Sequence, residues 1–230
     1  MLSTPANDPQ DTTKRLGLTR CANAPFALPS DVSSCLFKRI NEDLSSREKR
    51  TREFNAGRWC AANVLGELKV TGEVGVAEDR SPIWPTGITG SISHSDLFVW
   101  CLAGRTDSLV SIGIDTEPVV DEATLKHLRN EILSDQEMQI GLDAGYNEFE
   151  SFTAIFSAKE CFYKCAYQLQ PVFIGFHDVE VVAMDNQTIR LEMSSDSPNQ
   201  IKELRTMQVE YLIQDQNVFT ACWLRQKESE

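Results

Sequence analysis

Hydrophobic residues in the first half of the chain recur with two different periods. Between Ser45 and Leu68 they fall three and four residues apart, which predicts a helix, at Phe54, Ala61, Val64, Leu65 and Leu68. Short apolar runs at 97–103 and 109–114 are typical of strands. Between the helix and these runs, the segment 80–87 contains two prolines in four residues. We expect no regular structure there.

The second half of the chain repeats this plan. Helical periodicity at 122–132 and 150–169 is followed by four strand-like runs, at 179–184, 189–193, 209–213 and 218–224. The turn sequences 185–187 and 215–217 predict hairpins between them. Each half therefore reads as a helix followed by antiparallel strands, an α+β pattern, with no residue-level repeat. We expect three parts: a loose N-terminal arm at 1–15, an N-terminal lobe at 16–112 and a C-terminal lobe at 113–230.

Composition narrows the possible partners. The chain has 230 residues and a net charge of -12, which argues against nucleic acid or an anionic membrane as its main partner. Its seven cysteines include no Cys-x-x-Cys pair, which favours buried free thiols in a reducing cytosol over a zinc site. The N-terminal segment lacks the apolar run of a secretory signal. No stretch reaches the roughly 20 apolar residues that a membrane span needs, so we expect a cytoplasmic protein.

Two carboxylates, Asp115 and Glu117, follow the strand-like run at 109–114. Because side chains alternate along a strand, both should lie on one face. Adjacent carboxylates repel each other unless a cation lies between them, and a set of oxygen ligands favours Mg²⁺ or Mn²⁺. Taken alone, an Asp-x-Glu pair is more often a solvated strand end.

A helix over 151–169 would divide its side chains between two faces. Apolar residues fill one broad arc, and Ser157, Glu160 and Lys164 cluster on the opposite side. Glu160 and Lys164 are also spaced as an ordinary surface pair, so this helix suits a core element and an active site equally. Lys159 falls inside the apolar arc, where its ammonium group must reach solvent or meet an anion.

The segment 87–95 combines two glycines, four hydroxyl side chains and His94. Glycines let backbone amides approach an anion, and hydroxyl and imidazole groups can donate to phosphate oxygens. Ile92 stands where a nucleophile elbow would need serine, which disfavours a Ser-His hydrolase. The alternative for His94 is a hydrogen-bonded structural imidazole.

Basic residues are concentrated at 47–58, which holds five of the 22 in the chain. In so acidic a protein, this patch suits a phosphate-rich ligand. The alternative is an ordinary charged helix face. Arg58 and Arg80 stand out because each flanks a turn marked by glycine or proline.

Four motifs occur in a fixed order: Arg52-x-x-x-x-Gly57-Arg58, Gly90-Ser-Ile-Ser-His94, Gly113-Ile-Asp-Thr-Glu117 and Ser157-Ala-Lys-Glu-Cys-Phe-Tyr-Lys164. This order resembles the 4′-phosphopantetheinyl transferases of the two-lobed, monomeric kind, and the first two motifs resemble the enterobactin-synthetase type. The segment Leu133-Ser-x-x-Glu137 is also similar. Phe156 departs from the family, because many members carry tryptophan there. The resemblance covers about 47–164.

This resemblance implies a fold and a reaction. The fold would be a pseudo-dimer of two similar α+β lobes, each a helix packed on a small antiparallel sheet. In the reaction, the hydroxyl of a serine on an apo acyl, aryl or peptidyl carrier protein attacks the β-phosphate of coenzyme A. Phosphopantetheine is transferred and 3′,5′-bisphosphoadenosine leaves. The resemblance also implies Mg²⁺ (or Mn²⁺) as cofactor and a role in siderophore or other secondary-metabolite synthesis.

The resemblance also assigns roles to residues of this chain. It implies a metal site made of Asp115, Glu117 and Glu160. Glu160, directly or through water, would activate the serine hydroxyl, with Lys164 as the second catalytic residue. Phosphate contacts would come from Ser93, His94, Lys159 and Lys164, and contacts to the 3′-phosphate and adenine end from Arg52, Arg58 and Arg80. Asp115 would also belong to the cofactor-binding residues.

Two other classes of protein compete with this interpretation. One is a different Mg²⁺-dependent phosphoryl-transfer enzyme or a nuclease, and the acidic balance weighs against a nuclease. The other is a non-catalytic module that binds coenzyme A or a carrier protein. The presence of all three carboxylates and both lysines disfavours such a module, because binding alone would not require the metal cluster.

Overall fold

The computed structural model describes residues 16–21, 24–39 and 45–227; the expected N-terminal arm at 1–15 lies outside these residues. The elements of the first lobe are β1 (Leu18–Arg20), β2 (Val32–Arg39), α2 (Ser46–Glu67), β3 (Gly75–Val76), β4 (Pro82–Ile83), β5 (Ile88–His94) and β6 (Phe98–Arg105). Those that follow are β7 (Leu109–Pro118), α3 (Glu122–Ile132), α4 (Asp135–Asp143), α5 (Glu148–Tyr167), η1 (Phe176–Asp178), β8 (Val179–Met184), β9 (Thr188–Met193), η2 (Lys202–Leu204), β10 (Thr206–Gln214) and β11 (Asn217–Arg225).

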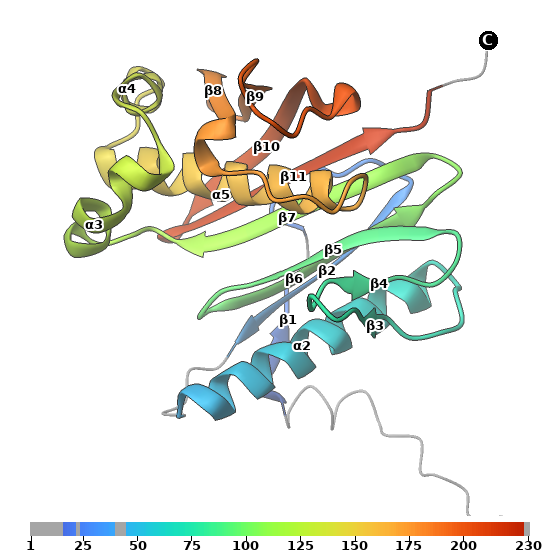
Figure 1. The fold of residues 1–230 in the computed structure, drawn as a ribbon. Helices are drawn as coiled ribbons and strands as arrows, with labels where there is room; N and C mark the ends of the chain where they lie inside the picture. The colour runs from blue at the N-terminus through green and yellow to red at the C-terminus, as the bar shows by residue number, and fades with distance from the viewer. Residues whose placement is uncertain (1–15, 22–23, 40–44, 228–230) are drawn as a thin grey trace, which may run out of the picture.

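Two antiparallel sheets stack face to face, and each carries a long helix on its outer side (Figure 1). The first sheet has the order β1-β2-β6-β5 and is covered by α2; the second has the order β7-β11-β10-β9-β8 and is covered by α5. Between the sheets lies an apolar core that includes Trp100, Leu102, Ile112, Ile114 and Phe219. The predicted α+β class with two lobes is confirmed.

Both long helices begin at the residues that the sequence marks. Ser45 caps α2, with Glu48 completing a capping box, and Asn147 with Glu150 does the same for α5. The apolar side of α2 packs on the first sheet through Ala56, Cys60, Val64 and Leu65, among others. These two helices and the predicted hairpins at 185–187 and 215–217 are confirmed.

Some elements differ from the prediction. Strands β1 and β2 precede α2, so the first lobe does not simply run from helix to strands. The segment 80–87 is not wholly irregular, because Pro82–Ile83 pairs with Gly75–Val76. Proline is tolerated there because, among the residues that the structure describes, no strand pairs with the other edge of this two-stranded ribbon. The Gly- and Ser-rich segment forms β5, a strand that its composition hides.

Strands β5 and β7 join the two lobes through side chains. Ser91 Oγ accepts a hydrogen bond from the Ile114 amide at 3.2 Å, and Ser93 Oγ accepts one from the Thr116 amide at 3.2 Å. The chain leaves the first sheet at Arg105 and enters the second at Leu109. The proposed lobe bounds at 112 and 113 stay a prediction.

Helix α5 lies directly on β7 at Gly113. A Cβ atom at this position would stand 1.9 Å from the carbonyl oxygen of Cys161, so only glycine allows the helix to approach this closely. This contact fixes the helix face that carries Glu160 and Lys164 above the carboxylates of β7. Within the described ranges, no helix is both long and apolar enough to cross a membrane.

Candidate active site

Asp115 is the centre of a buried polar network where the two lobes meet. Only 2% of its surface is exposed. Its Oδ1 atom accepts hydrogen bonds from Ser93 Oγ at 2.9 Å and from Lys164 Nζ at 2.6 Å. Its Oδ2 atom accepts one from Ser157 Oγ at 2.8 Å. One carboxylate is thus held by β5 of the first lobe and by two turns of α5.

Lys164 supplies the positive charge of this network. Its ammonium group bridges Asp115 and Ser93, donating to Ser93 Oγ at 3.2 Å. Burial opposes its charge, but the charge of Asp115, a hydrogen bond to it and the charge of Glu160 outweigh burial and raise the Lys164 pKa. The lysine is therefore fully charged at neutral pH.

Glu117 and Glu160 add two further carboxyl groups beside Asp115, and their environment resists their ionisation. Burial, followed by repulsion from Asp115, raises the pKa of Glu117 to about 8, although Lys164 opposes the rise. The pKa of Glu160 is also raised, first by burial and further by Asp115, again against Lys164. Three acids with a single lysine therefore form a site in which full ionisation of the carboxyl groups is opposed unless a further cation is present.

The carboxylate oxygens of this site are the type of ligand that a hard divalent cation prefers. A bound Mg²⁺ would also relieve the mutual repulsion of these carboxylates. They do not form a finished set, however. Among the described residues, no group of three or more His, Cys, Asp or Glu side chains stands ready to hold a metal ion. The carboxylate oxygens of Asp115 are occupied by Lys164 and the two serines.

Lys159 points away from this site. Its ammonium group pairs with Glu137 Oε1 at 2.7 Å and donates to the carbonyls of Ile132 at 2.9 Å and Phe176 at 2.8 Å. All three ammonium hydrogens are therefore used, and the side chain is almost fully buried. Of the two outcomes expected for Lys159, solvent exposure or pairing with an anion, the structure has the second. This geometry gives no support to a contact between Lys159 and a phosphate.

A depression of about 730 Å³ on the first lobe collects three of the expected phosphate contacts, Arg58, Arg80 and His94. The guanidinium group of Arg58 donates to the carbonyls of Val74 and Gly75 and lies 5.0 Å from the centre of the Phe54 ring. Arg52 lines a neighbouring depression of about 1020 Å³, which shares Arg58. The basic residues therefore line two adjoining hollows along α2.

Side chains alternate along β5, so the hydroxyl groups of its motif lie on the opposite face from the imidazole group of His94. Ile92 and His94 face the depression, whereas Ser91 and Ser93 face β7. The His94 ring stands at the edge of the hollow, where the surrounding protein, then Lys164 and Arg39, lower its pKa against the pull of Glu53. Ser93 is already bonded to Asp115, Lys164 and the Thr116 amide, so its hydroxyl serves the network and not the hollow.

Sequence reasoning missed several residues that hold together the elements around the site. Glu137 was seen only as part of a motif, yet it caps α4, accepts from the Val181 amide and pairs with Lys159. Its signal was the Ser134-x-x-Glu137 capping box. Asp79 and Tyr167, which bond to each other across the lobes, carried no signal, because neither belongs to a motif.

Comparison with known proteins agrees with this geometry. Residues 42–104 match the family model of the 4'-phosphopantetheinyl transferase N-terminal domain, and residues 111–222 match the model of the 4'-phosphopantetheinyl transferase superfamily. The fold and site thus define a two-lobed transferase that acts on a phosphate-bearing substrate. The chain belongs to the 4′-phosphopantetheinyl transferase superfamily, whose members transfer phosphopantetheine from coenzyme A to carrier proteins.

Individual relatives support the same assignment. Enterobactin synthase component D of Salmonella typhimurium is 33% identical over 177 residues, covering 76% of this chain and 73% of the relative. The 4'-phosphopantetheinyl transferase Npt of Nocardia iowensis is 31% identical over 176 residues, covering 67% and 73%. PptT of Mycobacterium tuberculosis is 29% identical over 148 residues, covering 61% of each chain. The predicted family and enzyme class are confirmed.

Proposed function

We propose that this enzyme transfers 4′-phosphopantetheine from coenzyme A to a serine of an apo carrier protein and releases 3′,5′-bisphosphoadenosine, in a Mg²⁺-dependent reaction that serves siderophore synthesis. The network around Asp115 is the observation that supports this most directly. It places a charged lysine and three acids at the junction of the lobes, beside a basic hollow that suits the other end of coenzyme A. The siderophore role rests on likeness to enterobactin synthase component D.

The chain's own groups divide the work of this reaction. Lys164 and His94 bind oxygens of the pyrophosphate, and Arg58 and Arg80 bind the 3′-phosphate, with Arg52 toward the adenine end. Glu160 accepts the proton of the carrier serine, a task for which its raised pKa suits it. Ser93 and Ser157 hold Asp115 in place. Asp115, Glu117 and Glu160 would hold Mg²⁺, which when bound neutralises charge that develops on the phosphates.

A carrier-modification assay tests the proposal. The protein is incubated with coenzyme A, Mg²⁺ and a panel of apo carrier proteins, and each carrier is weighed by mass spectrometry. Phosphopantetheine should be added to a siderophore-type carrier, with bisphosphoadenosine formed in equal amount. No gain in mass on any carrier would overturn the proposed function. Activity that persists fully in excess chelator would overturn the Mg²⁺ requirement alone.

The raised pKa of Glu117 gives a prediction about the metal. A carboxyl whose pKa rises on folding, from about 4.5 to about 8 here, holds its proton more tightly in the folded state. Metal-free protein should therefore lose stability as the pH rises between these values. Mg²⁺ should restore stability most at pH 8, because it binds the deprotonated carboxylates.

Thermal unfolding measured at several pH values, with Mg²⁺ or with chelator, checks this prediction. The Glu117→Gln variant should show a flatter dependence on pH without metal and a smaller gain from Mg²⁺. An equal gain from Mg²⁺ in wild type and variant would show that Glu117 is not a ligand.

A further inference from the structure

The last two turns of α5 reach across to the first lobe at three points. Lys164 donates to Ser93 of β5. Gln168, which follows the helix, accepts a hydrogen bond from Thr89 of the same strand at 2.7 Å. Between them, the Tyr167 hydroxyl donates to Asp79, in the turn that connects β3 to β4. These spacings of three and four residues place all three contacts on one face of α5, which is also the face that carries Glu160.

The turn that Tyr167 touches is the one that carries Arg80. It is closed by hydrogen bonds from the Ala77 amide to the Ser81 carbonyl and from the Arg80 amide to the Ala77 carbonyl, each 3.0 Å long. Asp79 braces it, because its Oδ1 atom accepts from the Ser81 amide at 2.9 Å while its Oδ2 atom accepts from Tyr167. The hydrogen bond from Tyr167, followed by those from Ser81, lowers the Asp79 pKa to about 2.

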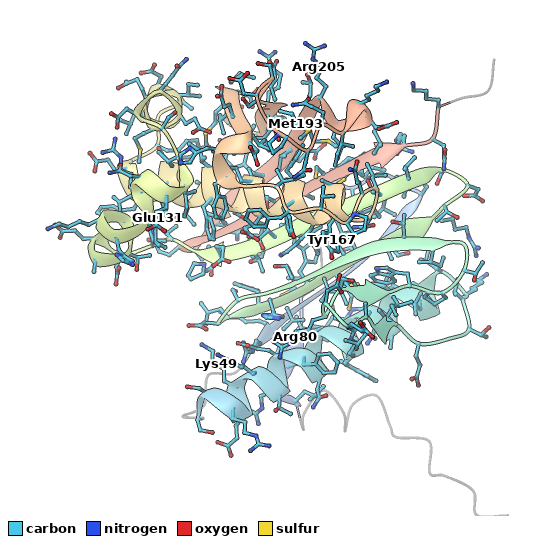
Figure 2. All side chains as sticks on the ribbon, in the orientation of Figure 1. Lys49, Arg80, Glu131, Tyr167, Met193 and Arg205 are labelled. Atoms are coloured by element: carbon cyan, nitrogen blue, oxygen red, sulfur yellow. The ribbon has the colours of Figure 1, made fainter. Side chains whose placement is uncertain are left out.

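Arg80 needs such support because of its backbone. Its φ of 72° lies in the left-handed region, which a non-glycine residue adopts at a cost in free energy. Its side chain lines the basic hollow together with Arg58 and His94. Figure 2 shows Tyr167 on the side of α5 that faces the first lobe, with Arg80 in that lobe.

We propose that Tyr167 and Asp79 form a latch between the two lobes that positions Arg80 to bind the 3′-phosphate of coenzyme A. Tyr167 and Asp79 are positioning residues in this proposal, which rests on the phosphate-binding role proposed above for Arg80. In the function proposed above, Lys164 on α5 contributes to the pyrophosphate site and Arg80 of the 77–81 turn contributes to the 3′-phosphate site, so one ligand contacts both lobes. Because the ribose limits the spacing of these phosphates, an enzyme whose two subsites are already held at a matching spacing loses less entropy on binding.

Coenzyme A and dephospho-coenzyme A, which lacks the 3′-phosphate, separate this role from a general structural one. Isothermal titration calorimetry in the presence of Mg²⁺ measures the Kd of each ligand without any transfer step. For Tyr167→Phe, which removes only the hydroxyl, we expect the Kd for coenzyme A to rise about 3- to 10-fold, in keeping with the loss of one typical intramolecular hydrogen bond at an exposed position. The Kd for dephospho-coenzyme A should stay unchanged. Tyr146→Phe, which removes a tyrosine hydroxyl elsewhere in the second lobe, should change neither value.

Asp79→Ala gives a second test, because loss of its charge and loss of the latch should change the affinity for coenzyme A in opposite directions. Removing a negative charge beside an anion site should by itself tighten binding of coenzyme A, whereas loss of the latch should weaken it. Glu78→Ala is the matched control, since it removes the same charge from the neighbouring position. We expect weaker binding of coenzyme A for Asp79→Ala, and unchanged or slightly tighter binding of coenzyme A for Glu78→Ala. In the double variant, Tyr167→Phe should add no further loss to Asp79→Ala, because the two residues act as one unit.

Arg80→Ala distinguishes failure of the latch from failure of the role given to Arg80. Suppose that Arg80→Ala weakens binding of coenzyme A but not of dephospho-coenzyme A, while Tyr167→Phe leaves both affinities unchanged. The latch is then wrong and the role of Arg80 stands. If Arg80→Ala leaves both affinities unchanged, the role of Arg80 is wrong and the latch falls with it. If Tyr167→Phe weakens binding of both ligands equally, the latch is also wrong, since the substitution would then have changed the ligand site as a whole.

Discussion

Lys159→Met should lower the free energy of unfolding by about 3–5 kcal/mol, the usual cost of breaking a buried ion pair by removing one partner. The Lys159 side chain is 2% exposed and that of its partner Glu137 is 3% exposed. Without the lysine, the Glu137 carboxylate stays buried without its counter-ion. The carbonyls of Ile132 and Phe176 also lose their donor. One substitution thus loosens the end of α3, the start of α4 and the η1 segment together.

Urea unfolding followed by circular dichroism measures this effect. The matched control is Arg129→Met, because Arg129 and Asp135 also pair α3 with α4, but at the surface. An exposed pair contributes about 0–1 kcal/mol. Replacing both partners, as Lys159→Met with Glu137→Leu, should restore part of the loss because no unpaired charge remains. A loss below about 1 kcal/mol for Lys159→Met would show that the pair does not hold these segments.

The same variant tests the expectation that the resemblance placed on Lys159. At a temperature where Lys159→Met is folded, it should bind coenzyme A as wild type does, because the ammonium group has no free hydrogen for a phosphate. A clear loss of affinity for coenzyme A in the folded variant would show that Lys159 contributes to binding this ligand.

The sequence alone led to the long helices and the C-terminal hairpins because each has a strong local cause. Amphipathic periodicity and capping residues specify α2 and α5, and turn residues between apolar runs specify β8–β11. Strand β5 was hidden because its inward-facing residues Ser91 and Ser93 meet a neighbouring lobe, where hydroxyl groups and not apolar side chains make the contact. A pattern read along one strand carries no information about a partner in another sheet.

The candidate site divides in the same way. Helix geometry brought Ser157, Glu160 and Lys164 to one face and singled out Lys159, and the structure adds that Ser157 and Lys164 both bond to Asp115. The partner of Lys159 could not be found along the sequence, because Glu137 lies 22 residues earlier and reaches it only through packing of α4 on α5. The link from Tyr167 to Asp79 spans 88 residues, beyond any local rule.

Burial also changes which substitution tests the site cleanly. From the sequence, Asp115→Ala should abolish activity and leave the fold intact. In the structure, Asp115 is the shared partner of Ser93, Ser157 and Lys164, so removing it leaves a buried lysine and two hydroxyl groups without their acceptor. Loss of activity in Asp115→Ala would therefore combine chemistry with unfolding. Glu160 is half-buried on α5 and is the better choice.

Glu160→Gln should reduce kcat by about 10²–10⁴-fold, the range over which a positioned general base contributes. The amide keeps the size of the side chain but cannot accept the serine proton and is a poor Mg²⁺ ligand. Because the proposed contacts to coenzyme A also include the basic hollow on the first lobe, its KM should change much less than kcat. The thermal midpoint should stay the same or rise, since the raised pKa of Glu160 shows that its charge is disfavoured by burial and by Asp115.

Initial rates of carrier modification, measured over a range of coenzyme A concentrations at each pH, give kcat and KM. Glu148→Gln is the matched control, because it makes the same change in the first turn of the same helix, at an exposed position, and should leave kcat unchanged. In wild type, the rate should rise with pH as Glu160 loses its proton, and the slope should vanish in Glu160→Gln. A variant that keeps its rate and its pH profile would show that Glu160 is not the base, and the serine proton would then have to leave through Asp115 or Glu117, the remaining acids of the network.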